Sequence, residues 1–223
     1  MRREPTAKEV RKAARAAVQA LADNNIDCCV FGSAACHFYG MENRDPADVD
    51  IVLLTNDGRD IEYIKYLITL SNAKLYPVDS IDPNATYKKL FYDLGRGRSC
   101  KVDVLHPGQA TNLRVPVIPK DRINYYYDIP VMPILPLLLM KLQGWVDHRH
   151  SKKRWEQAKV QRDAADVREM LELAVDEHGV QLESSDGDWL PTGFIYKMEG
   201  RVEEYVKKFP DSREYWEYIG FDV

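Results

Sequence analysis

The sequence predicts an α+β fold: a short mixed β-sheet with packed helices, followed by a helical bundle. Two short apolar runs, residues 28–31 and 49–54, each end at turn-forming residues, which is typical of buried strands. A third region, residues 87–105, has the pattern of a hairpin. From Pro133 onward, apolar residues recur at helical spacing instead. We therefore expect four or five strands in the first half of the chain and helices in the second.

Composition excludes several classes of protein. Hydrophobic residues make up 45% of the 223 residues and charged residues 30%, which indicates a soluble globular protein and excludes a disordered or fibrous one. The formal net charge of -4 argues against a dedicated polyanion binder, which is normally basic, but leaves room for a local basic patch.

The cysteines and the apolar segments indicate the compartment. Four cysteines lie in apolar or motif-like surroundings, without the paired spacing of a metal site: Cys28, Cys29, Cys36 and Cys100. Such cysteines are typical of small buried side chains in a reducing compartment. The longest apolar stretch, residues 129–140, is too short to span a bilayer and contains three prolines. We expect a cytoplasmic protein with no membrane partner.

The first elements follow one another closely. Apolar residues at helical spacing predict a helix over residues 6–22, and Glu4 and Glu9 add acidity that an N-terminal transit peptide would avoid. The strand at 28–31 then leads directly into a helix at 34–39. A polar loop over residues 40–47 precedes the second strand.

The rest of the first half predicts a helix and a hairpin. Isoleucines and a leucine at helical spacing mark a helix over residues 61–68, and a loop follows around residues 77–83. Strands at 87–94 and 100–105 are joined by a glycine-containing connection of four residues, which suits a hairpin. Residues 113–118 and 125–127 fit neither period.

The second half predicts helices joined by short loops. The expected segments are a helix at 135–146, a basic loop at 148–154, a long helix at 155–176 and tail helices at 194–209 and 213–218. We place the boundary near residues 128–133, with an α/β domain over 1–130 and a helical domain over 131–223.

Three aspartates carry the chemical signal. Asp48 and Asp50 alternate with apolar residues on a predicted strand, so both carboxylates point to one face. Asp103 repeats the pattern between two valines on another strand. Carboxylates so close repel each other unless a cation lies between them, and Mg²⁺ prefers such oxygen ligands. Three of them could hold two metal ions that clamp the oxygens of a phosphoryl transfer. Each alone could instead be an exposed edge charge.

Gly32 and Ser33 form a strand–turn–helix junction upstream of these acids. Glycine lets a phosphate approach the backbone, the serine hydroxyl can donate a hydrogen bond, and a helix start offers free N–H groups to an anion. The order along the chain is thus a phosphate cradle, a pair of metal acids and a third metal acid. A plain turn is the alternative interpretation of this pair.

Residues 30–54 resemble the signature of nucleotidyltransferases of the DNA-polymerase-β-like superfamily: an apolar run, Gly, Gly or Ser, a gap, and Asp-x-Asp between apolar residues. Fourteen residues separate Ser33 from Asp48, so we expect a slightly longer loop than is usual in the family. Arg44 lies where small-molecule and abortive-infection-toxin-like relatives carry an arginine. Pro46 stands where they more often have threonine.

The second half carries two further resemblances. Residues 140–144 are similar to the family's helical lysine motif, with glycine in place of the usual alanine, and residues 162–167 to its Arg/Asp helix motif. Lys141 would then bind the triphosphate, and Asp166 would orient Lys141 or a substrate. The alternatives are a snorkelling surface lysine and a solvated helix charge. The tail after residue 177 resembles no family.

The resemblance implies transfer of a nucleoside monophosphate from an NTP such as ATP to an acceptor hydroxyl, with release of pyrophosphate. Asp48 and Asp50 would bind two Mg²⁺ ions, with Mn²⁺ as the alternative ion, and Asp103 would hold the catalytic one and help deprotonate the acceptor. Gly32 and Ser33 would hold the β- and γ-phosphates. Lys141, Arg44 and Asp166 would complete a nucleotide site in the cleft between the two halves.

The acceptor is less constrained than the reaction. We rank a small hydroxylated molecule first, a tRNA end second and a protein side chain third. Residues 148–154 are the only dense basic run, enough to steer an NTP or hold a tRNA end but not to follow a duplex, so we do not expect a long nucleic acid. The rival functions are a non-catalytic nucleotide-binding protein of this fold and a metal-dependent glycosyltransferase. The sequence does not fix the oligomeric state.

Overall fold

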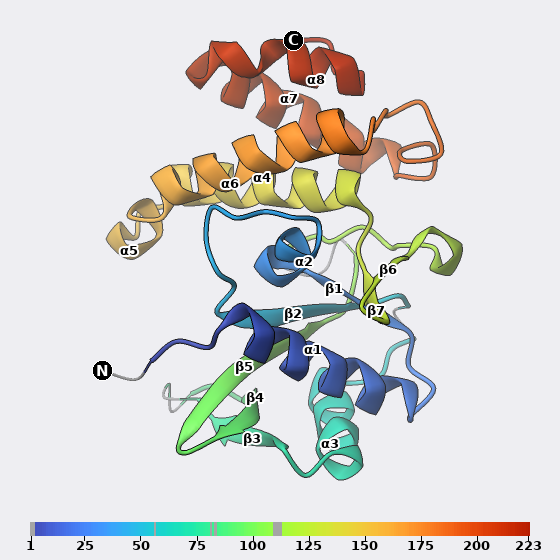
Figure 1. The fold of residues 1–223 in the computed structure, drawn as a ribbon, viewed down its shortest axis with the longest axis vertical. Coiled ribbons are helices and arrows are strands. Elements are labelled where there is room, and N and C mark those ends of the chain that lie inside the picture. Colours follow the sequence, from blue (N-terminus) through green and yellow to red (C-terminus); the bar gives the residue numbers. More distant parts are fainter. Residues whose placement is uncertain (1–2, 56, 81, 83, 109–112) are drawn as a thin grey trace. The chain divides into compact units, whose positions relative to one another are not determined.

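A computed structural model describes residues 3–55, 57–80, 82, 84–108 and 113–223 (Figure 1). The chain forms two compact units. The sheet unit comprises Met1–Phe38 and Asp45–Met132, and the helical unit comprises Tyr39–Arg44 and Pro133–Val223. The segment Tyr39–Arg44 thus packs with helices that are more than ninety residues away in sequence. The predicted α+β class is confirmed.

The described residues of the sheet unit form one mixed sheet of seven strands, in the order β3-β4-β5-β2-β1-β7-β6. Its strands are β1 Cys28–Phe31, β2 Asp48–Leu53, β3 Leu75–Asp79, β4 Lys88–Gly95, β5 Arg98–Leu105, β6 Asn124–Tyr126 and β7 Ile129–Val131. Two neighbouring pairs, β2 with β5 and β1 with β7, run parallel, and the other pairs are antiparallel. The parallel pair β2 and β5 carries the three aspartates.

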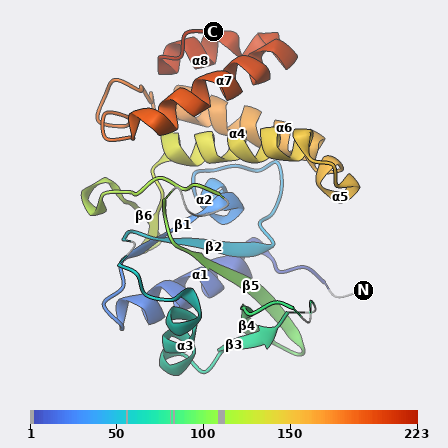
Figure 2. The same cartoon turned by 180° about the vertical axis from the view of Figure 1, so that it is seen from behind.

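Helices α1 Ala7–Ala22, α2 Gly32–Phe38 and α3 Ile61–Ser71, with the short η1 Lys120–Arg122, complete the sheet unit. α1 begins at Thr6, which forms a capping box with Glu9. In Figure 1 α1 crosses in front of β2 and β5, and in Figure 2 these strands lie in front of it, so α1 covers one face of the sheet. It buries mainly small residues and can therefore pack closely: Val10, Ala13, Ala14, Ala17, Ala20 and Leu21.

The helical unit contains α4 Ile134–His150, α5 Arg154–Gln157, α6 Val160–Glu172, α7 Thr192–Lys208 and α8 Arg213–Ile219, with a π-helical turn η2 Leu173–Glu177 and the 3₁₀ turn η3 Pro210–Ser212. α4 packs against α6 and α7. The tyrosine-rich tail supplies core: the Tyr205 ring lies 5.0 Å from that of Trp145 and 4.7 Å from that of Phe209. The Tyr205 hydroxyl donates a hydrogen bond to the Ala164 carbonyl at 2.9 Å, so its one polar group is satisfied in the core.

The sheet is larger than the four or five strands expected. The loop predicted around residues 77–83 begins inside β3, and its residues 81 and 83 lie outside the described part of the chain. Pro77 obscured this strand, but β3 is an edge strand, where a proline is tolerated. β6 and β7 contain three residues each, and Pro130 lies inside β7, so neither leaves a clear period in the sequence.

The boundaries of the basic loop and of the helix that follows it differ from those predicted. Residues 148–150 form the last turn of α4, so only residues 151–153 are a loop, and the helix expected at 155–176 is broken between α5 and α6. Glu156 accepts hydrogen bonds from the hydroxyl of Ser151 and from Lys153, at 3.1 Å for Lys153. Gln157 donates to the Ser151 carbonyl at 2.8 Å. These local bonds hold α5 as a separate turn. Among the described residues, no helix is both long and apolar enough to cross a membrane.

One charged contact ties α1 to the β4–β5 hairpin. Arg98 donates hydrogen bonds to both carboxylate oxygens of Glu9 at 2.7 Å. The hydrogen bond from Arg98, followed by that from the Thr6 backbone, lowers the pKa of Glu9 from 4.5 to about 2. A carboxyl group whose pKa is lowered on folding stabilises the fold above its unfolded pKa, and the contribution is lost as pH falls toward the folded pKa.

We predict that Glu9→Gln lowers the melting temperature at neutral pH and that the difference from the wild type disappears as pH falls from about 4.5 to about 2. Glutamine retains the capping-box geometry, so the variant isolates the charge. Thermal unfolding followed by circular dichroism across this range measures the effect. Glu214→Gln, at an exposed position of α8, is the control. A difference that does not change with pH would contradict the assignment.

Candidate active site

The three aspartates converge on adjacent strands. Asp48 and Asp50 lie on β2, and the parallel pairing places Asp50 in register with Asp103 of β5. One carboxylate oxygen of each lies within 4.8 Å of the others, and all three residues are partly exposed. This set of oxygen donors fits a hard divalent cation such as Mg²⁺ or Mn²⁺. The grouping expected from the sequence is therefore present, while the identity of an ion is not shown.

The burial pattern of the two strands explains why the carboxylates share one face. Val49 and Ile51 are fully buried on either side of Asp50, and the buried Val102 and Val104 flank Asp103 in the same way. Successive side chains of a strand point to opposite faces, so burying the aliphatic residues turns every acid outward. A shift of one residue in register would bury the acids, which makes the register well specified.

Lys101 belongs to this group and was not found from the sequence. It lies in register with Asp48, and its ammonium group donates a hydrogen bond to Asp103 Oδ2. Burial favours the neutral amine, but the hydrogen bond from Lys101 to Asp103 and the attraction of the aspartates outweigh it, so the pKa of Lys101 is raised. Its spacing of two residues from Asp103 is the signal that places both on one strand face. Lys101 offsets part of the acidic charge and shares Asp103 with any bound cation.

Gly32 is required where α2 leaves β1. Its φ of +67° is in the left-handed region that side chains disfavour. The antiparallel pairing of Phe31 with Asp50 brings this turn onto the acid pair, and a Cβ atom on Gly32 would lie 2.2 Å from Asp50 Oδ2. Ser33 follows in the first turn of α2 and is 6% exposed. The backbone of the turn therefore lies directly against a carboxylate that would hold a metal ion.

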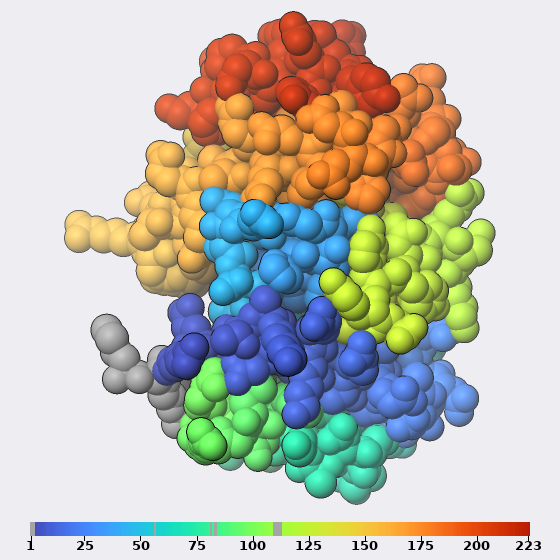
Figure 3. All heavy atoms as spheres, in the orientation of Figure 1, coloured from blue at the N-terminus to red at the C-terminus, as the bar shows by residue number. Residues whose placement is uncertain are grey.

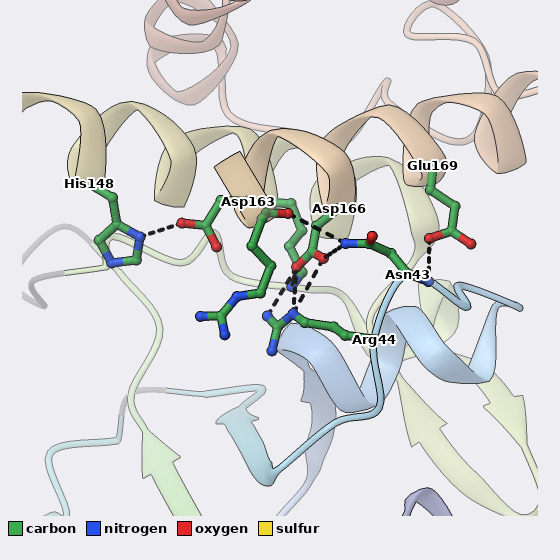
Figure 4. A network of polar contacts seen from close by, with 8 residues as sticks. Asn43, Arg44, His148, Asp163, Asp166 and Glu169 are labelled. Atoms are coloured by element: carbon green, nitrogen blue, oxygen red, sulfur yellow. Dashed lines mark hydrogen bonds and ion pairs between the residues drawn. The ribbon is translucent and has the colours of Figure 1, made fainter. Parts of the chain in front are cut away.

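A second polar cluster lies within the helical unit and is built on Asp166 of α6 (Figure 4). Asp166 is fully buried and accepts a hydrogen bond from Lys141 of α4 at 2.9 Å. Arg44 donates to Asp166 Oδ2 through Nε at 3.1 Å and Nη2 at 3.0 Å, and Asn43 donates to Oδ1 at 2.7 Å. Burial raises the pKa of Asp166, but Lys141 and Arg44 more than offset this, and the pKa is lowered. Asp166 is therefore not a solvated helix charge, and Lys141, 13% exposed, is not a surface lysine.

The same helix fixes the loop that carries Arg44. Glu169 accepts hydrogen bonds from the backbone N–H groups of Glu42 at 2.6 Å and Asn43 at 2.8 Å (Figure 4). Asp166 lies one turn earlier on α6 and holds the side chains of the same loop. α6 thus controls both the path of the Asn43–Arg44 backbone and the direction of its side chains.

The basic residues of 148–154 are mostly paired with acids. His148 lies 2.6 Å from Asp163, Arg149 forms an ion pair with Glu204 at 2.9 Å, and Lys153 pairs with Glu156. The charge of this segment is therefore offset locally. The eight expected site residues fall into two groups: Gly32, Ser33, Asp48, Asp50 and Asp103 in the sheet unit, and Arg44, Lys141 and Asp166 in the helical unit.

Comparison with solved structures identifies the fold. The chain is similar to an antigenic nucleotidyltransferase-like protein from Paracoccidioides brasiliensis, with a TM-score of 0.67 and 17% identity over 97% of this chain and 95% of that one. Lower similarities are found with ANT(2")-Ia in complex with adenylyl-2"-tobramycin (TM-score 0.45, 12% identity, 89% and 97% coverage) and with terminal uridylyl transferase 4 from Trypanosoma brucei with bound GTP (TM-score 0.39, 13% identity, 93% and 67% coverage). No family model and no curated protein matches the sequence. The expected nucleotidyltransferase fold is confirmed.

We predict that Gly32→Ala impairs metal binding much more than Gly97→Ala. Both glycines have similar positive φ values, +67° and +70°, so each alanine carries a comparable backbone cost of about 1–2 kcal/mol. Only the alanine at residue 32 collides with Asp50, whereas nothing lies within 4 Å of the position at Gly97. Calorimetric titration with Mn²⁺ measures the effect of the collision with Asp50 on metal affinity, and thermal unfolding measures the backbone cost of each alanine. Equal Mn²⁺ affinity in the two variants would show that the close approach of Gly32 to Asp50 is unimportant.

Proposed function

We propose that the protein is a divalent-metal-dependent nucleotidyltransferase, which transfers a nucleoside monophosphate from an NTP to an acceptor hydroxyl. The observation that carries the proposal is the convergence of Asp48, Asp50 and Asp103 beside the turn at Gly32. In the transfer, a bond forms between the acceptor oxygen and the α-phosphorus while the bond from that phosphorus to the β-phosphate oxygen breaks. Pyrophosphate leaves, and the acceptor loses a proton.

The sheet unit supplies the charged groups of this reaction. Asp48 and Asp50 would hold two Mg²⁺ ions and Asp103 the catalytic one, and such ions neutralise the charge of the phosphates and of the attacking oxygen. A carboxylate oxygen of Asp103 would accept the proton of the acceptor hydroxyl, and Lys101, hydrogen-bonded to Asp103 Oδ2, fixes the orientation of this carboxylate. The backbone at Gly32 and the hydroxyl of Ser33 bind the β- and γ-phosphates.

The helical unit supplies cations. Lys141 and Arg44 are proposed as nucleotide ligands, because each is partly exposed and each is oriented by the same buried carboxylate. Asp166 acts through them: it holds both side chains in one arrangement, which lowers the entropy that they would lose on binding a phosphate. It is a positioning residue and not a ligand.

We propose a small hydroxylated molecule as the acceptor. Asp103 lines a surface hollow of about 600 Å³ together with residues of α3 and β5 and of the segments just before β4 and just after β5, among them Lys65, Tyr87 and His106. Sites for small molecules usually have about 300–1,000 Å³. Tyr87 is 51% exposed, and Glu62 and Lys65 add polar groups to the lining. These groups suit a ligand with both a flat face and hydrogen-bonding hydroxyl groups.

We predict that Asp48→Asn and Asp50→Asn each abolish transfer and leave the fold intact. Labelled NTPs incubated with Mg²⁺ and panels of hydroxyl compounds and RNAs measure transfer, and an exposed aspartate, Asp121→Asn, is the control. Two unit charges about 4 Å apart in water repel by about 1 kcal/mol, so removing one should raise the metal-free melting temperature by about 2–4 °C. Retained transfer, or unfolding of both variants, would refute metal binding by these residues.

We predict that Lys141→Ala weakens Mg²⁺-dependent NTP binding about 10- to 100-fold, since a hydrogen bond to a charged group contributes about 1.5–3 kcal/mol. Lys120→Ala is the control: Lys120 is also paired with an aspartate, Asp27 at 2.8 Å compared with 2.9 Å for Lys141 and Asp166, and it lies in none of the proposed sites. Calorimetry without an acceptor measures affinity, and thermal unfolding checks both variants. Equal affinities in the two variants would exclude the triphosphate role.

A further inference from the structure

The outer face of α1 carries a dense group of cations. Lys8, Arg11, Lys12 and Arg15 follow one another at helical spacing and lie on one side, opposite the residues that α1 buries. Three of the four are exposed, and Arg11 is partly buried. Figure 3 shows α1, in dark blue, uncovered on this side of the sheet unit. We refer to these four residues as the α1 basic face.

No acid compensates the α1 basic face. Glu9 is the one carboxylate within α1, and it pairs with Arg98. Within the part of the chain that the structure describes, none of the four cations forms an ion pair. Like charges three and four residues apart destabilise a helix. A chain of net charge -4 has many carboxylates that could have offset them, so an anionic partner is the physical reason for keeping this group.

Two adjoining hollows lie on this face. One, of about 300 Å³, is lined by the four cations of the α1 basic face. The other, of about 170 Å³, shares Lys8 and Arg11 with the first and is also lined by His37, Phe38 and Tyr127. The four cations therefore adjoin a hollow with aromatic walls. This combination matches the two parts of a nucleotide unit, a phosphate and a flat base.

The aromatic wall is held in place by the same cations. The Arg15 guanidinium donates a hydrogen bond to the Tyr127 carbonyl at 2.8 Å, and the Arg11 guanidinium lies 4.3 Å from the centre of the Tyr127 ring. Phe38 contacts this ring edge-on, with 6.1 Å between centroids. Tyr127 nevertheless remains 57% exposed, so a face of its ring is available for stacking.

We propose that the α1 basic face is a binding site for single-stranded polynucleotide, whose phosphates contact the four cations and whose base stacks on Tyr127. The site goes beyond the transfer reaction and does not depend on it. A membrane surface fits less well, because the exposed side of α1 lacks the large apolar residues that insert into lipid. The expectation that residues 148–154 form the only basic cluster is wrong, because the α1 cations are spread over helical spacing and gather only on the folded helix.

The test is fluorescence anisotropy of a labelled oligouridine over a range of salt concentrations. Three to four phosphate contacts predict a log–log slope of about -2 to -3, at about 0.7 per contact. Lys8→Ala/Lys12→Ala should weaken binding about tenfold and reduce the slope by about 1.4. Lys207→Ala/Lys208→Ala, which removes two exposed lysines of α7, should change neither. Tyr127→Leu should weaken binding without changing the slope, and Tyr127→Phe should retain it.

Several results would overturn the proposal. The first is that the protein does not bind the oligonucleotide at low salt, and the second is that Lys207→Ala/Lys208→Ala loses as much affinity as Lys8→Ala/Lys12→Ala. The third is equal affinity for a duplex of the same length. The fourth is binding of vesicles of phosphatidylcholine and phosphatidylserine that depends on Lys8 and Lys12. Asp50→Asn should bind the oligonucleotide like the wild type. Failure of the transfer reaction would therefore leave this result unchanged, and failure of binding would leave the proposed transfer intact.

Discussion

Asp48, Asp50 and Asp103 are held close together although their charges repel, and much of the sheet unit is arranged around this constraint. The force that holds them is burial of the aliphatic side chains that alternate with them on β2 and β5, since a shift of one residue in register would move the acids into the core. The apolar core thus imposes an electrostatic cost on one face of the sheet. Lys101 offsets part of this cost in the absence of metal, and a divalent cation would offset more. The grouping of three carboxylates that could hold a metal ion is in this sense a consequence of how the strands pack.

The turn at Gly32 depends on the same arrangement. Because β1 pairs antiparallel with β2, the end of β1 must meet Asp50, and the chain has to leave the sheet there without adding a side chain. Gly32 has no side chain that could collide with Asp50, and its left-handed backbone conformation allows α2 to begin directly after β1. The order of the motif along the sequence, glycine and serine first and the acid pair later, therefore follows from one contact between two strands. The same contact places the backbone N–H groups at the start of α2 beside Asp50, where a phosphate bound to a metal ion would lie.

The parts of the structure that could be predicted are those set by local sequence. β1 and β5, with their alternating or continuous apolar residues, and α1, with its capping box, were found within a few residues of their ends. β3 and β7 were missed because Pro77 and Pro130 suggested loops, and β6 because three residues are too few to show a period. The group of three aspartates was found because the two-residue period of a strand places Asp48 and Asp50 on one face and because Asp103 repeats the pattern. The contact of Arg44 with Asp166 was not found, because it joins residues that are far apart in the sequence. Lys101 was also missed, although its spacing of two residues from Asp103 places both on one face of β5.

The cations of this chain show why charge must be assessed after folding. Along the sequence, residues 148–154 form the densest basic run, yet Asp163, Glu156 and Glu204 reach them from neighbouring helices. On α1 other residues, among them Glu9 and alanines, separate the cations, so that they do not form a continuous basic run in the sequence. The helix turns Glu9 toward Arg98 and collects the four cations on the other side. Whether a basic residue can attract a distant anion depends on the acids within a few ångströms of it, because these set the local field. Among the described residues, the α1 basic face is therefore a group of four cations without a neighbouring carboxylate, although their spacing along the sequence makes the group hard to recognise.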